Sequence, residues 1–305
     1  MACLLMVSCN KDGEFNPKNK IDRIYYSSSY KSEIYNNGSW ETDYTNNRPK
    51  YVSEIWHWGG NVLKSISHYA YDGELSYTEN FEYEGNRIIS ISSLDGDGRH
   101  IINYENGKIS SIDCYSYNEK YALYEFSHDK GKISSIRATY FSLEKSALSP
   151  FSVNALRFFI PISNPDNIVK AMANNSERND SKGGIIETCD MKFEWSGKNV
   201  SKITYTIDNE LPYTYEYTYD EKLNPFYGLF YLEEDPWQLL MLSKNNVTRE
   251  FIREDDYYDE SNYTYTYNGK VPITKSHTDV HTYTNTYTDD YCRDTYTNTY
   301  YYEYK

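Results

Sequence analysis

The chain of 305 residues carries 31 Lys and Arg against 45 Asp and Glu, which gives a net charge of −14. This acidity argues against nucleic acid and anionic membrane surfaces as partners, because both require a basic patch. Tyr occurs 36 times, so aromatic rings must supply much of the area that folding buries.

The first residues are typical of an export signal. An apolar stretch, residues 4–8, leads directly to Cys9, which is similar to a bacterial lipoprotein signal in which this Cys becomes the acylated N-terminus. We therefore expect residues 1–9 to be the signal, Cys9 the lipidation site, and residues 10–20 a polar tether outside the fold. The stretch is shorter and less basic than in that family, so we expect the true start to lie upstream. The alternative is that Cys9 is an ordinary residue in a frayed terminus.

A repeat follows, in which two aliphatic residues three apart come after an aromatic residue or His with constant spacing. The five copies are Trp58 with Leu63 and Ile66, Tyr83 with Ile88 and Ile91, Tyr104 with Ile109 and Ile112, His128 with Ile133 and Ile136, and Trp195 with Val200 and Ile203. Each copy has a Gly between the ring and the first aliphatic residue: Gly60, Gly85, Gly107, Gly131 and Gly197.

The repeat predicts β-hairpins. Gly supplies the positive φ that such turns need, and the first aliphatic residue lies opposite the ring. A bulge after the turn would bring the second aliphatic residue back to the same face. Successive hairpins then form an antiparallel meander. A later candidate, Tyr267 with Gly269, has Pro272 at the aliphatic position, which indicates an edge or a strand end.

The remaining segments fit a single all-β domain over residues 21–305. Tyr alternates with Thr or Glu in several segments, which is strand patterning. An irregular insertion is expected at about 142–184, where two hairpins are degenerate or replaced. Residues 235–242 predict one short helix, with Asp235 as N-cap and Pro236 at its first position. The fold class is therefore a large antiparallel β-meander of about 14–20 strands, closed or nearly closed into a barrel, because closure removes exposed edges.

Two family resemblances follow from these residues. Residues 126–133 resemble the YD repeat of Rhs-type bacterial surface proteins. The layout of Cys9, Tyr-rich hairpins, an Asn-Pro-Phe segment (224–226) and an Asn-Asn-Val segment (245–247) is similar to Bacteroides lipoproteins of unknown function with a porin-like β fold. This second resemblance implies a lipid-anchored protein of the outer membrane, at the cell surface or the periplasmic face, and brings no catalytic residues. A pore is not expected, because the face opposite Tyr is Thr, Glu, Asn and Ser instead of the apolar residues that lipid requires.

Candidates for chemistry are few. His277 and His281 are four apart, but their neighbours indicate a strand, where about 13 Å separates them, too far for one metal ion. The carboxylates Asp255, Asp256, Asp259 and Glu260 are candidate calcium ligands, with a solvated loop tip as the alternative. No motif of a catalytic nucleophile occurs, and the separated Cys114, Cys189 and Cys292 predict no disulfide framework. We expect no enzyme, no cofactor and no structural metal.

Two tryptophans, Trp40 and Trp237, lie off the repeat and are candidates for stacking on a ligand. The expected function is a non-enzymatic binding or scaffold module of the envelope, whose partner is a glycan or another envelope protein, with the lipid anchor as its only membrane contact. The alternative is a glycan hydrolase, which would require a cleft with two carboxylates about 5–10 Å apart.

Overall fold

The computed structural model describes residues 19–93, 98–141, 185–207, 212–227, 242–254, 257–285 and 290–305. These residues form strands and turns. The strands are β1 (Ile21–Asn36), β2 (Ser39–Gly59), β3 (Val62–Tyr69), β4 (Leu75–Glu84), β5 (Arg87–Ser93), β6 (Gly98–Glu105), β7 (Lys108–Ser116), β8 (Glu119–Asp129), β9 (Lys132–Phe141), β10 (Ile185–Ser196), β11 (Asn199–Ile207), β12 (Tyr213–Leu223), β13 (Asn245–Glu254), β14 (Tyr257–Asn268), β15 (Val271–Thr284) and β16 (Tyr291–Tyr304). In this part of the chain, no helix is long and apolar enough to span a membrane. The expected helix at 235–242 lies outside it, apart from Leu242.

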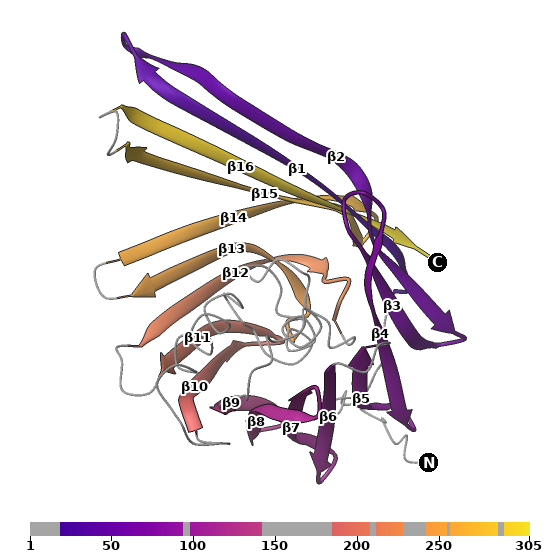
Figure 1. Cartoon of the computed structure of the whole chain (residues 1–305). Coiled ribbons are helices and arrows are strands. Elements are labelled where there is room, and N and C mark those ends of the chain that lie inside the picture. The colour runs from indigo at the N-terminus through magenta and orange to yellow at the C-terminus, as the bar shows by residue number, and fades with distance from the viewer. Residues whose placement is uncertain are drawn as a thin grey trace, which may run out of the picture.

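All sixteen strands form one closed antiparallel barrel in which each strand pairs with its neighbours in sequence. Pairing of β1 with β16 closes the circle (Figure 1), so the prediction of a meander closed into a barrel is confirmed. Closure pairs both sides of every strand and leaves no free sheet edge. Strand β9 pairs directly with β10, so the two hairpins missing from the repeat are replaced by the connection 142–184.

Strand length varies around the barrel. Strands β1, β2, β15 and β16 have 14 to 21 residues, whereas β3 to β9 have 7 to 11. The four long strands therefore project beyond the rest as a wing (Figure 1). We call the rim with the repeat turns the turn rim, and the opposite rim, where the wing ends, the loop rim. The described chain begins at the turn rim, where Lys20 Nζ donates a hydrogen bond to Gly60 O at 2.7 Å.

The hairpin geometry expected from the repeat is confirmed. In the first copy Trp58 pairs with Leu63, and Trp56 pairs with Ile66. A register shift between these pairs leaves Lys64 as an extra residue, which is the predicted bulge. Leu63 and Ile66 are consequently both buried. The other four copies have the same ring-to-aliphatic pairing and the same shift.

Glycine enables these turns. The five repeat glycines have φ values of 67°, 61°, 80°, 82° and 59° in chain order, a region that residues with a side chain rarely adopt. A Cβ atom on Gly131 would meet nothing within 4 Å. A substitution there is therefore opposed by the backbone conformation and by nothing else.

The structure shows three further copies, one of which, at Tyr267, the sequence pattern had already indicated. Tyr219 pairs with Val247, Tyr267 with Pro272, and Tyr304 with Ile21, each beside a register shift. Pro272 is the second residue of β15, so the prediction of a strand end there is correct. In the third copy the two chain termini take the place of a turn. The barrel is thus eight equivalent hairpins, one of them open.

A belt of aromatic side chains joins neighbouring hairpins. Seven rings donate a hydrogen bond to the backbone carbonyl of the first aliphatic position in the preceding hairpin, at 2.5–2.9 Å: Trp58 to Ile21, Tyr83 to Leu63, Tyr104 to Ile88, Trp195 to Ile133, Tyr219 to Val200, Tyr265 to Val247 and Tyr304 to Pro272. Each acceptor directly precedes a bulged residue, where the strand ladder is interrupted. Burial raises the pKa of Tyr83 and of Tyr104 far above the ordinary value, so these hydroxyls remain donors.

The two faces of the barrel wall differ in chemistry. The inner face carries the buried cluster of Ile, Tyr and Trp, in which Phe226 packs between Trp56 and Tyr302 with ring centroids 6.3 and 5.9 Å apart. The outer face carries polar side chains. On β14 to β16 it shows paired hydroxyls at 2.5–3.0 Å: Thr266 with Thr274, Ser276 with Thr299, and Thr278 with Thr297. The cysteines Cys114, Cys189 and Cys292 are free and buried.

We predict that the belt stabilises the barrel through its hydroxyl bonds as well as through ring packing. Tyr83→Phe keeps the ring and loses the bond to Leu63 O, at a cost of about 1–2 kcal/mol in the free energy of unfolding. Tyr83→Ala also loses the packing of a half-buried ring and should cost about 3 kcal/mol. Tyr117→Phe, at an exposed turn, serves as the control and should change nothing. Urea denaturation measures all three, and a Tyr83→Phe variant as stable as wild type would contradict the belt.

We also predict that Gly131→Val lowers the free energy of unfolding by about 1–3 kcal/mol, because a β-branched residue must adopt positive φ there. Gly131→Asn is the matched control, since Asn tolerates this region, and it should retain most of the stability. Equal melting temperatures for the Val and Asn variants would show that φ does not limit this turn.

Candidate functional site

The structure places some of the residues singled out in the sequence, and others lie outside its described part. Cys9, Trp237, Asp255 and Asp256 lie outside, as does the side chain of Asp259. The fourth candidate from the acidic run, Glu260, has a described side chain. Glu260 accepts hydrogen bonds from Arg249 at 2.6 Å and from Asn262 at 3.1 Å, and the first of these bonds contributes most to lowering its pKa. Glu260 is therefore a partner of an arginine.

Trp40 lies at the end of the wing, on its outer face. Its ring packs against Tyr35 and Tyr291 at centroid distances of 5.2 and 5.4 Å, and the guanidinium of Arg293 lies 4.4 Å from its centre. This cation–π contact occupies the ring in the described structure. The arrangement shows how Trp40 is held and gives it three protein contacts.

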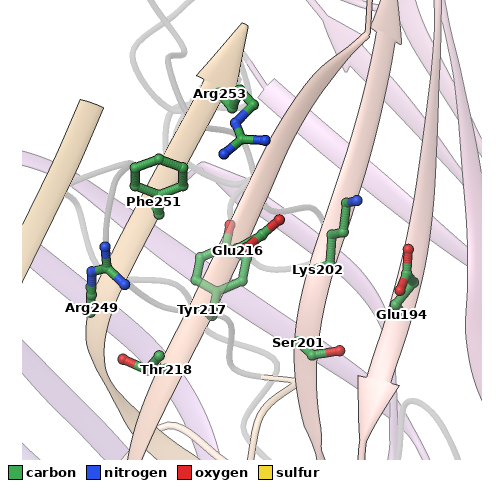
Figure 2. A pocket seen from close by; sticks show the side chains of 9 residues that line it. All are labelled: Glu194, Ser201, Lys202, Glu216, Tyr217, Thr218, Arg249, Phe251 and Arg253. Carbon is green, nitrogen blue, oxygen red and sulfur yellow. The ribbon is translucent and has the colours of Figure 1, made fainter. Parts of the chain in front are cut away.

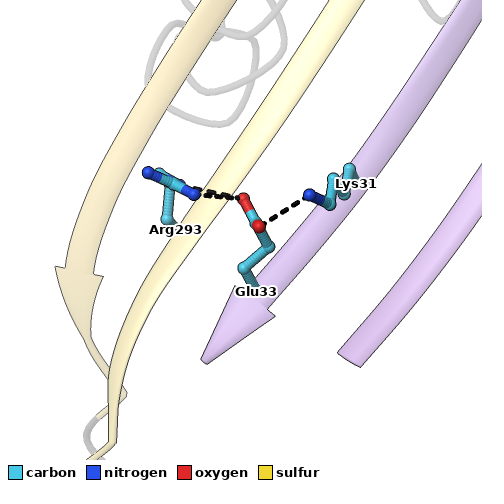
Figure 3. Close-up of polar contacts among 3 residues, drawn as sticks. All are labelled: Lys31, Glu33 and Arg293. Atoms are coloured by element: carbon cyan, nitrogen blue, oxygen red, sulfur yellow. Dashed lines mark hydrogen bonds and ion pairs between the residues drawn. The ribbon is translucent and has the colours of Figure 1, made fainter. Parts of the chain in front are cut away.

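Arg293 is itself fixed by a carboxylate, as Figure 3 shows. Glu33 Oε2 accepts hydrogen bonds from Nε and Nη2 of Arg293 at 2.9 and 2.7 Å, and its Oε1 accepts one from Lys31 at 2.6 Å. The bond from Lys31, followed by those from Arg293, lowers the pKa of Glu33. Glu33 and Arg293 are 260 positions apart, so only closure of the barrel brings them together.

The inner face of the wing carries a row of tyrosines that we call the tyrosine wall: Tyr26, Tyr30, Tyr44, Tyr296 and Tyr300. Neighbouring rings are in contact, with centroid distances of 5.1 Å for Tyr26–Tyr300, 4.7 Å for Tyr30–Tyr296 and 6.0 Å for Tyr30–Tyr44. The rows come from β1, β2 and β16, which pair in register here. The wall therefore consists of two groups of touching rings, Tyr26 with Tyr300 and Tyr30 with Tyr44 and Tyr296, on one face of three strands.

Exposure increases along this wall from the core to the loop rim. Tyr300 is 6% exposed, whereas Tyr296 is 41% and Tyr44 is 53% exposed. The exposed rings belong to the inner face and lie on a wing that projects past the shorter strands. Exposed aromatic rings next to one another are unusual on a surface that binds nothing.

Polar groups lie between the rings. Asn298 Oδ1 accepts a hydrogen bond from Tyr26 at 2.7 Å, and Asp294 accepts one from Tyr283 at 3.3 Å. Burial raises the pKa of Tyr30 and is also the largest cause of the raised pKa of Tyr283. Both phenols are thus neutral donors at physiological pH. The wall combines flat apolar faces with a few fixed donors and acceptors, which is the usual composition of a ligand site.

A cluster of three ionisable side chains on the inner face is shielded from solvent. His68 lies between two carboxylates, with Nε2 3.3 Å from Glu79 Oε2 and Nδ1 3.9 Å from Glu54 Oε1, and Tyr77 stacks on its ring. Glu54 also accepts a hydrogen bond from Trp56 at 2.8 Å. The three residues are only 1–4% exposed. A catalytic acid must touch its substrate, so this cluster belongs to the core.

His277 and His281 both lie on β15, as the strand pattern predicted. His277 Nε2 is 2.9 Å from Asp279 Oδ1, and His281 packs near Tyr296. Over the described ranges, no group of three or more His, Cys, Asp or Glu side chains is arranged to hold a metal ion.

We predict a pH-dependent contribution of the Glu33 cluster. Because the pKa of Glu33 is lowered by folding, its contribution is complete above the unfolded pKa of about 4.3 and is lost as pH falls through the lower folded value. The melting temperature of wild type should therefore exceed that of Glu33→Gln at pH 7, and the difference should shrink steadily below pH about 4. Glu41→Gln, a carboxylate at the same wing tip, is the control. A difference that does not depend on pH would contradict an ionic role for Glu33.

No protein-family model matches the chain, and no curated protein matches it either. Two solved structures are similar to it over most of both chains. A porin-like protein from Bacteroides uniformis ATCC 8492 has 14% identity and a TM-score of 0.45, covering 92% of this chain and 96% of that chain. A porin-like protein from Bacteroides vulgatus ATCC 8482 has 9% identity and a TM-score of 0.44, covering 90% and 97%. Both similarities are distant.

Proposed function

We propose that the protein is a lipid-anchored, non-enzymatic binding module of the outer membrane that holds a glycan against the tyrosine wall. The observation that carries the proposal is the row of rings on one face of the wing, whose exposure rises from 6% at Tyr300 to 53% at Tyr44. A row that was buried along its whole length would be part of the hydrophobic core. The rings of this row instead pass from the core to a surface exposed to solvent.

A glycan fits the chemistry of the wall. The C–H faces of sugar rings stack on aromatic rings, while their hydroxyls need donors and acceptors close by. Asn298 and Asp294 on β16, and Asp279 on the neighbouring strand β15, supply acceptors beside the rings. The row is also linear, since it follows strands that rise about 3.4 Å per residue, and this suits an extended chain of sugars.

The point where the tether would join the barrel supports one orientation of the protein relative to the membrane. Residues 10–20 would tether Cys9 to Ile21, which lies at the turn rim opposite Tyr304. The exposed end of the tyrosine wall lies at the loop rim, at the other end of the barrel. With the lipid at Cys9, the wing therefore points away from the membrane, where a glycan can reach it.

The polar outer face supports attachment by lipid in preference to insertion of the barrel. A strand facing lipid requires an apolar band, whereas the outer face of the wing carries the hydroxyl pairs of Ser276, Thr278 and their partners. Charged side chains on β10 to β13 continue this polar surface. An acyl anchor needs more than one chain for stable attachment, as mature bacterial lipoproteins have.

The hydrolase alternative has less support. It requires two carboxylates that flank the scissile bond of a bound sugar. Glu54 and Glu79 approach each other across His68, but they are 2% and 1% exposed. The exposed part of the tyrosine wall carries Asp279 and Asp294, which are already engaged with His277 and Tyr283.

Glycan binding at the tyrosine wall is tested with a glycan array, and calorimetry then measures the affinity for the ligand that binds best. Tyr44→Ala and Tyr296→Ala should each weaken binding about fivefold, since one stacking contact contributes about 1 kcal/mol. Tyr117→Ala removes an equally exposed ring elsewhere and should leave binding unchanged. Equal weakening by all three variants would contradict the wall as the site. Shortened glycans after incubation with wild type would establish the hydrolase and refute a purely binding role.

The anchor is tested by labelling cells that express the gene with a clickable fatty acid. We expect wild type and Cys3→Ala to carry the label and Cys9→Ala to lose it, because only Cys9 follows the apolar stretch at the position of acylation. Label retained in Cys9→Ala would refute lipidation at that residue.

A further inference from the structure

The outer face of the barrel contains a groove across β10, β11, β12 and β13. Its volume is about 520 Å³, within the range of small-ligand sites, and its lining includes Lys202, Glu216, Thr218, Arg249, Phe251 and Arg253. Figure 2 shows these side chains on the same face of adjacent strands, with the two arginines on either side of Phe251 along β13. The groove lies on the outer face of the barrel sheet, whereas the core lies on its inner face.

The groove brings three cationic side chains together with two carboxylates, Glu194 and Glu216, in a chain whose net charge is −14. The guanidinium carbons of Arg249 and Arg253 lie 5.4 and 5.6 Å from the centre of the Phe251 ring. Arg249 is also held by Glu260 at 2.6 Å. In the part of the chain that the structure describes, neither Arg253 nor Lys202 forms an ion pair. Arg253 and Lys202 are the cations that the groove offers to an anion, and Lys202 lies between Glu194 and Glu216 on the paired strands.

The space between these cations is polar. Glu216 on β12 pairs in register with Lys202 on one side and with Phe251 on the other. It is exposed and, within the described ranges, makes no ion pair either. The hydroxyls of Ser201 and Thr218 lie at the end of the groove away from Arg253 (Figure 2). A simple anion would gain nothing from a carboxylate here, whereas a ligand with hydroxyl groups would donate hydrogen bonds to it.

We propose that this groove binds an acidic sugar residue, a pyranose carrying a carboxylate. Its carboxylate lies between Arg253 and Lys202, where charge-assisted hydrogen bonds are strong and the arginine fork matches the two oxygens. Its hydroxyls donate to Glu216 and its ring packs on Phe251. Each feature of the groove then has one counterpart in the ligand.

This site does not depend on the tyrosine wall. The wall lies on the inner face of β1, β2 and β16, whereas the groove lies on the outer face of β10 to β13. The wall offers neutral rings, and the groove offers fixed charges. A polymer of acidic sugars is the ligand class that the groove adds to the protein.

The experiment measures binding of tetragalacturonate by calorimetry at low salt. Wild type should bind it, and both added salt and replacement by neutral maltotetraose should weaken binding strongly. Arg253→Gln and Lys202→Gln should each raise the Kd about tenfold, as expected for loss of a charge-assisted hydrogen bond. The matched control is Arg137→Gln, another exposed arginine of the outer face, which pairs with Asp190 at 3.5 Å and should have no effect.

Further variants separate this proposal from its alternatives. Tyr44→Ala should leave tetragalacturonate binding unchanged, and loss of binding in that variant would assign the ligand to the tyrosine wall and overturn the groove. Phe251→Leu should weaken tetragalacturonate but not inorganic sulfate. Equal Kd values for sulfate and tetragalacturonate in wild type would show a general anion site and refute recognition of a sugar. Equal weakening by Arg137→Gln and Arg253→Gln would also refute the groove.

Discussion

The barrel depends on one interaction, the hydrogen bond from a repeat aromatic to the backbone carbonyl beside the bulge of the preceding hairpin. A bulge interrupts the ladder, and a buried carbonyl without a donor destabilises the fold. The ring that packs over the neighbouring hairpin also carries the donor that this carbonyl needs. Both Trp Nε1 and Tyr OH reach such a carbonyl, so this role accounts for two tryptophans and five tyrosines of the barrel.

This belt acts at the turn rim and leaves the other end of each strand without such a constraint. Strand length can therefore vary at the loop rim, from 7 residues in β5 to 21 in β2. The longest strands continue the inner aromatic face beyond the shared core, and their tyrosines become exposed there. The candidate binding surface is thus an extension of the packing pattern, since the same alternation that buries Tyr300 exposes Tyr296.

The net charge of this protein does not describe how its charged side chains are distributed locally. The net value of −14 argues against a broad basic surface. Yet antiparallel pairing places Lys202 on β11 and both Arg249 and Arg253 on β13, on either side of β12, although these residues lie up to 51 positions apart. Acidic residues dominate the net charge, while the pairing of three strands decides where these cations lie.

Much of the fold was determined by local sequence. Two aliphatic residues three apart, a ring five residues upstream and an intervening Gly specify a hairpin with a bulge, and these requirements concern neighbours in the chain. The pattern missed the copies at Tyr219 and Tyr304 because their turns are replaced by a long connection and by the chain ends. Tertiary structure alone decided which carbonyl each ring reaches, that Arg293 holds Trp40, and which tyrosines stay exposed. Those outcomes depend on closure of β1 onto β16 and on unequal strand lengths, which place side chains hundreds of positions apart in contact and which no local pattern contains.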